Sequence, residues 1–213
     1  MKRIWVTAAL LGALVVWLGT SRAGEGEFKN LFNGQDLKGW RFLVPKTADP
    51  DKTFMVQDGI IVVSGKPDGY FFTDKSYKNY ILRFDWRYKR PKGLEDDEKF
   101  GGNSGLLVHI QEPHKVWPKC VEVQGMNKEH GRIFGLGKFE AKFNFDAKAL
   151  KKARKPVGEW NTTEVLVKDG AITSKVNGAQ ISTGKSDLTE GPFGFQSEGA
   201  EIHFKNIKIK VLD

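Results

Sequence analysis

Two polar side chains interrupt an otherwise apolar segment, Val121-Glu122-Val123-Gln124, at alternate positions. In a β-strand, residues two apart share a face and lie roughly 6.6 Å from each other, so Glu122 and Gln124 would point together while the valines face a core. A carboxyl group can take up and release a proton, whereas the amide of Gln124 can only form hydrogen bonds. The segment therefore predicts a face with one acid–base group, Glu122; a solvated strand face is the plainer alternative.

A histidine in the preceding apolar segment is the second candidate for proton transfer. His109 alternates with Val108 and Ile110, which predicts that its ring lies on the face of Leu107. A catalytic base and a buried, hydrogen-bonded histidine fit this position equally well. The other histidines show no metal-ligand spacing of the His-x-x-x-His kind, and we expect structural or surface roles for them: His114, His130 and His203.

Short strands must position these candidates, because no helical period extends far along the sequence. Residues 80–88 alternate cleanly, with Leu82, Phe84 and Trp86 on one face. Asp169-Gly170 and Asn177-Gly178 are dipeptides that two-residue hairpin turns prefer, because both central positions need positive φ. The other expected strands span residues 59–64, 70–73, 105–110, 121–124, 163–167, 171–176, 180–182, 193–196 and 201–211.

Two stretches depart from this pattern. We expect residues 146–155 to form a short helix or a solvent-exposed segment outside the sheets. Residues 91–102 contain consecutive acids, and we expect them to form a long exposed loop. Many short strands separated by turns are typical of a β-sandwich or barrel. Cys120 is the only cysteine, which excludes an internal disulfide, and we expect it to be a small buried residue. Because no linker or repeat divides the chain, we expect one all-β domain over residues 24–213.

The N-terminus, residues 1–23, has the three parts of a secretory signal peptide. Lys2 and Arg3 precede an apolar run of about 15 residues, shorter than the roughly 20 that span a bilayer. Ser21-Arg22-Ala23 then places small residues at the cleavage positions. We expect cleavage near Ala23 and a periplasmic or secreted protein with no stable membrane insertion.

Cleavage also changes the charge of the chain. Loss of Lys2, Arg3 and Arg22 lowers Lys plus Arg from 34 to 31 against 26 acids, so the net charge falls from +8 to +5. Basic residues are scattered among acids, and the densest cluster, residues 148–155, has no aromatic platform beside it. Nucleic-acid binding requires basic residues concentrated in a stripe or patch, so this scattered distribution of charge argues against a nucleic-acid partner.

Five sequence blocks occur in an order typical of one protein family. They are LFNGQDLKGW at 31–40, GNSG at 102–105, VEVQ at 121–124, GEWN at 158–161, and GFQSEG at 194–199 leading into FKNI at 204–207. Together they resemble the 3-keto-disaccharide hydrolase family over about residues 28–212. The resemblance implies a concanavalin A-like jelly-roll β-sandwich of two curved antiparallel sheets, and an oligosaccharide or glycoside substrate whose sugar is oxidised at C3.

The resemblance also implies a route for cleavage. Related glucanases use two carboxylates on one strand, and Gln124 replaces the second, so double displacement loses a required group. A 3-keto sugar needs only a base, because its ketone acidifies the C2 hydrogen and the C1 substituent leaves by elimination before water adds back. Glu122 or His109 would be that base, although the family commonly has Arg at the latter position. Gln124, Asn103 or a divalent cation would steady the enolate oxygen.

Further residues are expected to contact the sugar. Trp117, in a loop flanked by prolines, is the best candidate for stacking, because sugars present apolar C–H faces to aromatic rings. Asn127 lies where the family often has an acid. Gln196 and Glu198 either line the same cleft or face water, and Asn103 either binds the ligand or turns the chain into a strand. The residues themselves require no cofactor.

Two other classes of protein remain compatible with the sequence. A non-catalytic, lectin-like carbohydrate-binding domain would use the same sandwich, but such modules usually travel tethered to an enzyme. A structural or adhesive domain has no motif in its favour. We therefore expect an exported glycoside-cleaving enzyme, with net hydrolysis by elimination and hydration.

Overall fold

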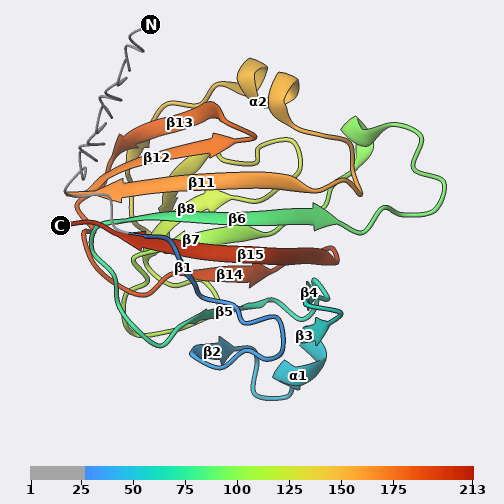
Figure 1. The fold of residues 1–213 in the computed structure, drawn as a ribbon, viewed down its shortest axis with the longest axis horizontal. Coiled ribbons are helices and arrows are strands. Elements are labelled where there is room, and N and C mark those ends of the chain that lie inside the picture. Colours follow the sequence, from blue (N-terminus) through green and yellow to red (C-terminus); the bar gives the residue numbers. More distant parts are fainter. Residues whose placement is uncertain (1–26) are drawn as a thin grey trace, which may run out of the picture.

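Two antiparallel β-sheets packed face to face make up most of the computed structural model, which describes residues 27–213 (Figure 1). The expected signal peptide, residues 1–23, lies outside the described residues. The prediction of an all-β jelly-roll sandwich is confirmed. Within residues 27–213, no helix is long and apolar enough to cross a bilayer.

The large sheet forms the nearer layer in Figure 1 and has β6 and β15 near its centre. Its strands in spatial order are β10 (Lys142–Phe143), β13 (Ala179–Lys185), β12 (Ala171–Val176), β11 (Asn161–Lys168), β6 (Tyr80–Tyr88), β15 (Ile202–Val211), β4 (Ile60–Val63) and β3 (Phe54–Gln57). A short strand, β1 (Lys29–Asn30), also pairs with β15.

The small sheet forms the more distant layer and carries the candidate acid–base residue. Its strands in spatial order are β2 (Trp40–Leu43), β5 (Gly69–Thr73), β14 (Gly194–Ser197), β7 (Gly105–Val108), β8 (Cys120–Gln124) and β9 (Ile133–Leu136). Three short helical elements complete the described chain: α1 (Pro50–Thr53), the 3₁₀ turn η1 (Asp97–Lys99) and α2 (Ala147–Ala153).

The core between the sheets is built from the inward-facing residues of both. On β6, Leu82, Phe84 and Trp86 are all buried, as their alternation predicts. On the small sheet, the rings of Phe71 and Phe195 stack with their centroids 5.2 Å apart. Each large apolar side chain removed from water contributes about 1.5–3 kcal/mol, so this continuous cluster holds the two layers together.

Two tight hairpins fix the register of β11, β12 and β13 in the large sheet. Asp169-Gly170 joins β11 to β12 with φ of 50° and 79°, and Asn177-Gly178 joins β12 to β13 with φ of 48° and 87°. Positive φ at both central residues is the geometry that such dipeptides supply without strain. Both predicted turns are therefore confirmed.

A second apolar layer lies on the outer face of the small sheet, away from the core. Its buried members are Tyr70, Phe72, Leu107, Ile110 and Cys120. The segment after β7 covers part of it, because the ring of His114 stands edge-on to Phe72 with the centroids 4.9 Å apart. The expectation that Cys120 is buried is confirmed. This outer layer borders the polar residues of β8.

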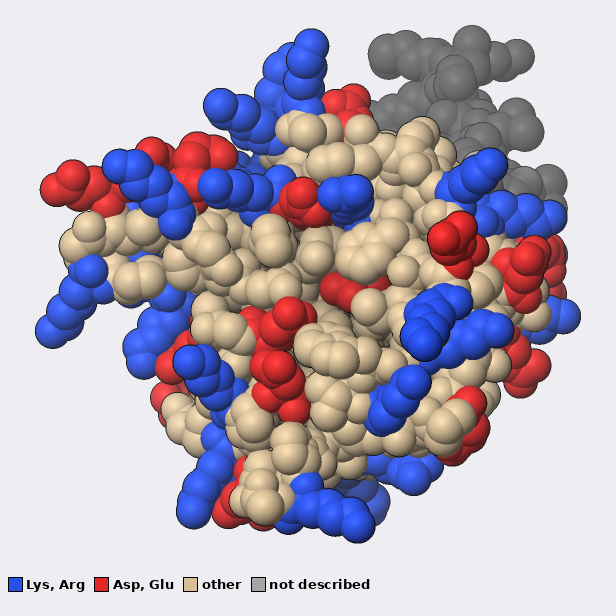
Figure 2. Space-filling model, turned by 180° about the vertical axis from the view of Figure 1, so that it is seen from behind, with Lys and Arg blue, Asp and Glu red and all other residues tan. Residues whose placement is uncertain are grey.

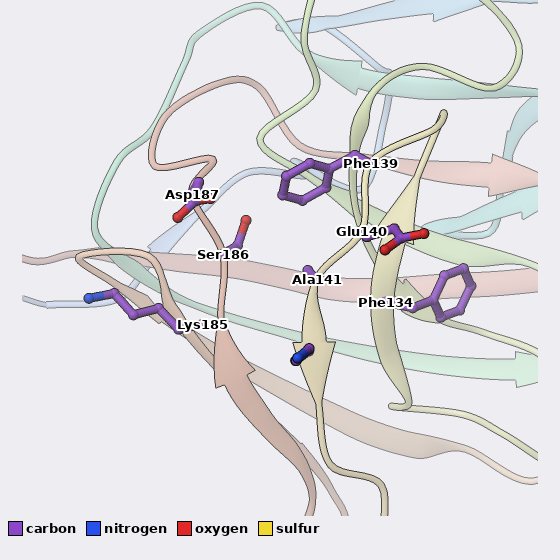
Figure 3. Close-up of a pocket in the computed structure, with 9 residues that line it drawn as sticks. Phe134, Phe139, Glu140, Ala141, Lys185, Ser186 and Asp187 are labelled. Atoms are coloured by element: carbon purple, nitrogen blue, oxygen red, sulfur yellow. The ribbon is translucent and has the colours of Figure 1, made fainter.

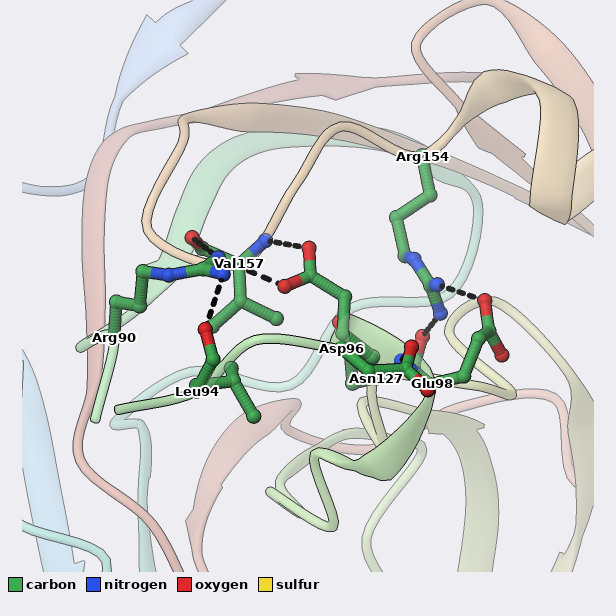
Figure 4. Close-up of polar contacts among 8 residues, drawn as sticks. Arg90, Leu94, Asp96, Glu98, Asn127, Arg154 and Val157 are labelled. Atoms are coloured by element: carbon green, nitrogen blue, oxygen red, sulfur yellow. Dashed lines mark hydrogen bonds and ion pairs between the residues drawn. The ribbon is translucent and has the colours of Figure 1, made fainter. Parts of the chain in front are cut away.

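The acidic loop after β6 is held against the body of the protein. Asp97 pairs with Arg90 at 2.7 Å. Arg154, just after α2, donates to the backbone carbonyl of Asn127 and to the carboxylate of Glu98, the latter at 3.0 Å (Figure 4). The prediction of a long exposed loop is confirmed for most of residues 91–102. One ion pair, between Arg154 and Glu98, also joins this loop to the segment that follows α2.

Candidate functional site

Glu122 lies on the outer face of the small sheet, within a row of facing residues from neighbouring strands. It pairs in register with Leu107 on β7 and with Phe134 on β9. Val121 and Val123 belong to the core between the sheets, as the alternation predicts. Glu122 is only 3% exposed, so its carboxyl group is largely removed from water.

Gly105 leaves a space that two polar side chains occupy. A Cβ atom built on Gly105 would come within 2.5 Å of Oε1 of Glu122, and closer still to Oε1 of Gln196. The two side chains reach this space from β8 and β14, the strands on either side of β7. Gln196 is fully buried, so its amide faces Glu122 rather than solvent.

The carboxyl groups at this place have unusual proton affinities. Burial raises the pKa of Glu122 to about 8, the charge of Glu198 adds to this, and the Gln196 amide opposes it. Burial also raises the pKa of Glu198, which a hydrogen bond from Asn103 opposes and the charge of Asp68 reinforces. Two carboxyl groups that both titrate above their ordinary range are typical of a functional site.

Two amides complete this cluster. Gln124 lies opposite Gly105 in register, and its Oε1 accepts the N–H of Met126 at 2.8 Å, which leaves its NH₂ group to donate to a ligand. Asn103 accepts the N–H of Ser104 through Oδ1 at 3.0 Å and pairs with Glu198 through an isolated backbone bridge. The structure thus brings together a set of the predicted residues: Asn103, Glu122, Gln124, Gln196 and Glu198.

His109 does not join this cluster. The prediction that it lies on the face of Leu107 is wrong, because its φ of 54° breaks the alternation after β7 and Ile110 takes the place in the outer layer. Its ring stands edge-on to the core residue Tyr80, and Nδ1 lies 2.9 Å from the carbonyl oxygen of Leu188. Burial lowers its pKa. Glu122 is therefore the better candidate for the base.

Asn127 and Trp117 have different surroundings from the cluster. Asn127 is buried, donates to the carbonyl of Asp97 at 3.3 Å, and accepts from Arg154 through its own carbonyl. These bonds make it an anchor for the acidic loop. Trp117 is 38% exposed in the segment after β7, so its ring is accessible, and its contact with substrate stays a prediction.

Phe134 is the aromatic residue that the sequence analysis missed. It lies directly across from Glu122 on β9, so the two side chains share the outer face. A hollow of about 650 Å³ lies beside β9, but the ring of Phe134 points away from the lining residues Ser186 and Asp187 (Figure 3). Glu122 does not line that hollow. The apolar run at residues 133–136 was the signal for β9.

The face over the small sheet has a distinct distribution of charge. Acidic side chains gather near its middle, and most lysine and arginine side chains lie nearer its outline (Figure 2). In the part of the chain that the structure describes, no group of three or more His, Cys, Asp or Glu residues is arranged to hold a metal ion. Acids near the middle of this face favour an uncharged ligand over a polyanion.

Comparison with known proteins adds independent findings. Residues 27–210 match a family described as a 3-keto-alpha-glucoside-1,2-lyase-like domain. A Bacteroides thetaiotaomicron protein named 3-keto-disaccharide hydrolase is 24% identical over 86% of this chain and 78% of its own. A crystal structure described as a "putative glycosyl hydrolase" from Parabacteroides distasonis is 27% identical, with a TM-score of 0.63 over 88% of this chain and 94% of that one. A Bacillus licheniformis β-glucanase, 12% identical with a TM-score of 0.51 over 90% of this chain and 100% of its own, shares the fold.

Proposed function

The chain belongs to the family of 3-keto-alpha-glucoside-1,2-lyase-like domains, and from this premise we propose that it cleaves glycosides whose sugar carries a ketone at C3. Cleavage proceeds by elimination and then hydration, so that the sum is hydrolysis. The observation that carries the proposal is the environment of Glu122: one buried carboxyl group with a pKa raised to about 8, flanked on its strand by an amide in place of a second acid.

The first step is proton transfer from carbon. The Glu122 carboxylate takes the C2 proton, and the electron pair of the C2–H bond moves toward the C3 oxygen to form an enolate. The free NH₂ group of Gln124 donates a hydrogen bond to that oxygen, which lowers the energy of the developing charge. A base with a pKa near 8 removes such a proton more readily than an ordinary carboxylate would.

The second step breaks the glycosidic bond. The enolate electrons return to form the C1=C2 double bond, the C1–O bond breaks with its electron pair, and the leaving oxygen takes a proton. Glu198 supplies this proton, because its raised pKa keeps part of it protonated at a pH where an ordinary glutamate is ionised. Water then adds across the C1=C2 bond of the product and yields the free 3-keto sugar.

The deciding experiment compares a 3-keto disaccharide with its unoxidised parent, using purified protein and following release of the leaving sugar. We expect cleavage of the keto form alone, with exchange of the C2 hydrogen for deuterium when the reaction runs in D₂O. Cleavage of both forms would support ordinary hydrolysis by Glu122 and Glu198. Tight binding of both forms without cleavage would support a lectin-like domain instead.

We also propose that the chain is exported, because residues 1–23 have the charge, apolar run and small-residue end of a signal peptide. Export would place the enzyme where glycans from outside the cell are met. Mass spectrometry of the protein recovered from periplasm and medium tests this directly. We expect a mature chain beginning at Gly24, and an intact N-terminus in the cytoplasmic fraction alone would contradict it.

A further inference from the structure

We propose that Gln196 is a positioning residue for the Glu122 carboxyl group, and that Gly105 is the position whose missing side chain makes their contact possible. The consequence for catalysis rests on the proposed function, whereas the contact itself does not. The proposed elimination and hydration do not require Gln196, and its sequence context predicts a residue that binds substrate or faces water.

The contact follows from three adjacent strands. Gly105 lies on β7, with β14 on one side and β8 on the other. From those neighbours, Oε1 of Gln196 and Oε1 of Glu122 both enter the small volume above the glycine, where any Cβ atom would meet them. Two oxygens confined to that volume are neighbours of one another, so a side chain at position 105 would displace one or both.

The burial of Gln196 favours a positioning role over the substrate-binding role expected from the sequence. The residue has no exposed surface, and in the described part of the chain neither Oε1 nor Nε2 forms a hydrogen bond of ordinary geometry. A buried amide without partners costs free energy. The amide faces the carboxyl group of Glu122. We infer that the contact with Glu122 is the reason why a buried amide is kept at this position despite its cost in free energy.

A glutamine is suited to a neighbour that changes its protonation state. Its amide has an acceptor end and a donor end, so it can accept a hydrogen bond from the neutral carboxyl group and donate one to the carboxylate. A second carboxylate would repel the ionised form, and a lysine would hold the carboxyl group permanently ionised. Glutamine serves both states, as an acid–base residue requires during a catalytic cycle.

The test uses variants that remove the amide or fill the space, with the pKa of Glu122 as the readout. We would follow the carboxyl carbon of Glu122 by NMR in protein labelled with ¹³C at Glu Cδ, assigning its signal by its loss in Glu122→Gln. In Gln196→Leu we expect the titration midpoint to rise by about one pH unit, because the amide opposes the effect of burial. We expect Gly105→Ala to move the midpoint as well and to lower kcat at least tenfold.

Matched controls separate positioning from a general loss of stability. Gly101→Ala introduces the same methyl group at a glycine with open space around it, and neither Gly101 nor Gly105 has positive φ. Ser182→Ala removes a buried polar group from β13 of the large sheet, whereas the cluster lies on the small sheet. We expect both controls to leave the Glu122 midpoint and kcat unchanged.

The outcomes decide the two proposals separately. An unchanged Glu122 midpoint in folded Gln196→Leu and Gly105→Ala proteins would overturn the positioning role. A shifted midpoint in protein that cleaves no 3-keto glycoside would uphold the positioning role and overturn the proposed function. If Gln196→Leu fails to fold, Gln196→Met and Gly105→Ala supply the same measurement with less disturbance of shape.

Discussion

Two glutamates on the outer faces of the two sheets have opposite properties. Glu164, on β11 of the large sheet, pairs with Arg83 at 2.6 Å and with Lys175 at 3.4 Å, and these partners lower its pKa although burial opposes them. Glu122, on β8 of the small sheet, has no cation partner among the described residues, and burial raises its pKa to about 8. The same residue type is thus fixed as an anion on one sheet and held ready to exchange a proton on the other.

The two glutamates show that the outer face of the large sheet is a solvated surface, whereas the outer face of the small sheet carries the candidate site. The outer face of the large sheet is covered by ion pairs and by cations stacked on an aromatic ring, with Lys205 lying 4.1 Å and Arg87 4.7 Å from the centroid of Trp160. Every one of these groups is satisfied by a neighbour. The outer face of the small sheet instead buries polar atoms without partners, including those of Tyr70 and Gln196. Unsatisfied buried groups are costly, and one of them, Gln196, lies beside the Glu122 carboxyl group.

The largest expected effect is on activity. Replacing Glu122 by Gln keeps the shape and removes the exchangeable proton, and we expect kcat on a 3-keto glycoside to fall by about 10²–10⁴-fold. Glu164→Gln, its counterpart on the other sheet, should leave kcat unchanged. Steady-state kinetics on both variants make the comparison, and equal losses in the two would contradict the assignment of Glu122.

The pH dependence of activity should report the same carboxyl group. If Glu122 acts as the base and Glu198 as the acid, the active form has Glu122 ionised and Glu198 protonated, so kcat/KM should pass through a maximum and fall on both sides of it. A pH profile from 5 to 9.5 with a 3-keto glycoside measures this. A kcat/KM that depends on a single ionisation would contradict the pairing of Glu122 as base with Glu198 as acid.

Glu122 should also make the fold less stable at high pH. Its folded pKa of about 8 lies above an unfolded value near 4.3, so the native state holds the proton more tightly between these values. Linkage then requires stability to fall as pH rises through that window. Glu122→Gln removes this loss. The difference in Tm between the variant and the wild type should therefore be several degrees larger at pH 8.5 than at pH 5. For a protein of this size, 1 kcal/mol shifts Tm by about 2–4 °C. Calorimetry at both values tests it, and a constant difference would refute it.

A smaller effect is expected where the acidic loop is anchored. Arg154 is nearly buried and donates to the Asn127 carbonyl and the Glu98 carboxylate. Arg154→Met should lower the free energy of unfolding by about 1–3 kcal/mol, because the carbonyl of the buried Asn127 loses its donor. Denaturant titration measures it, with Arg132→Met, which breaks a more exposed pair with Glu129, as the control. Equal, small losses would show that the anchor adds little.

The smallest effect should be that of the surface pair on the large sheet. Glu164→Gln weakens contacts with Arg83 and Lys175, whose side chains are 47% and 43% exposed. Exposed ion pairs contribute about 0–1 kcal/mol and are screened by salt, so we expect a loss within that range that shrinks at high ionic strength. A loss that persists in 1 M salt would show that packing, not charge, is the source.

The sequence predicted the parts of the fold that depend on local patterns. The alternation at residues 80–88 and the Asp169-Gly170 and Asn177-Gly178 turns were confirmed, because side-chain period and positive φ are local properties. The resemblance to the family was confirmed as well. Five strands were missed: the two-residue strands β1 and β10, and the four-residue strands β2, β3 and β9, whose residues show no clear alternation.

The site was predictable as a set of residues but not as an arrangement. Glu122 and its amide neighbour follow from alternation on one strand. The position of His109 did not, because a single residue with positive φ reverses the faces that follow it. The role of Gly105 was not predicted either. Gly105 leaves space for the side chain of Gln196, which is distant in sequence and becomes a neighbour only because β14 pairs with β7.

The place of β15 in the large sheet has a consequence for how the protein is made. This last strand lies between β6 and β4 and also pairs with β1, all of which end at or before Tyr88. A ribosome must therefore finish almost the whole chain before the sheet can close, and pairings this distant in sequence form slowly. Until its last strand has been made, the chain cannot complete the sheet. It therefore stays unfolded long enough to pass through a membrane channel, as the proposed export requires.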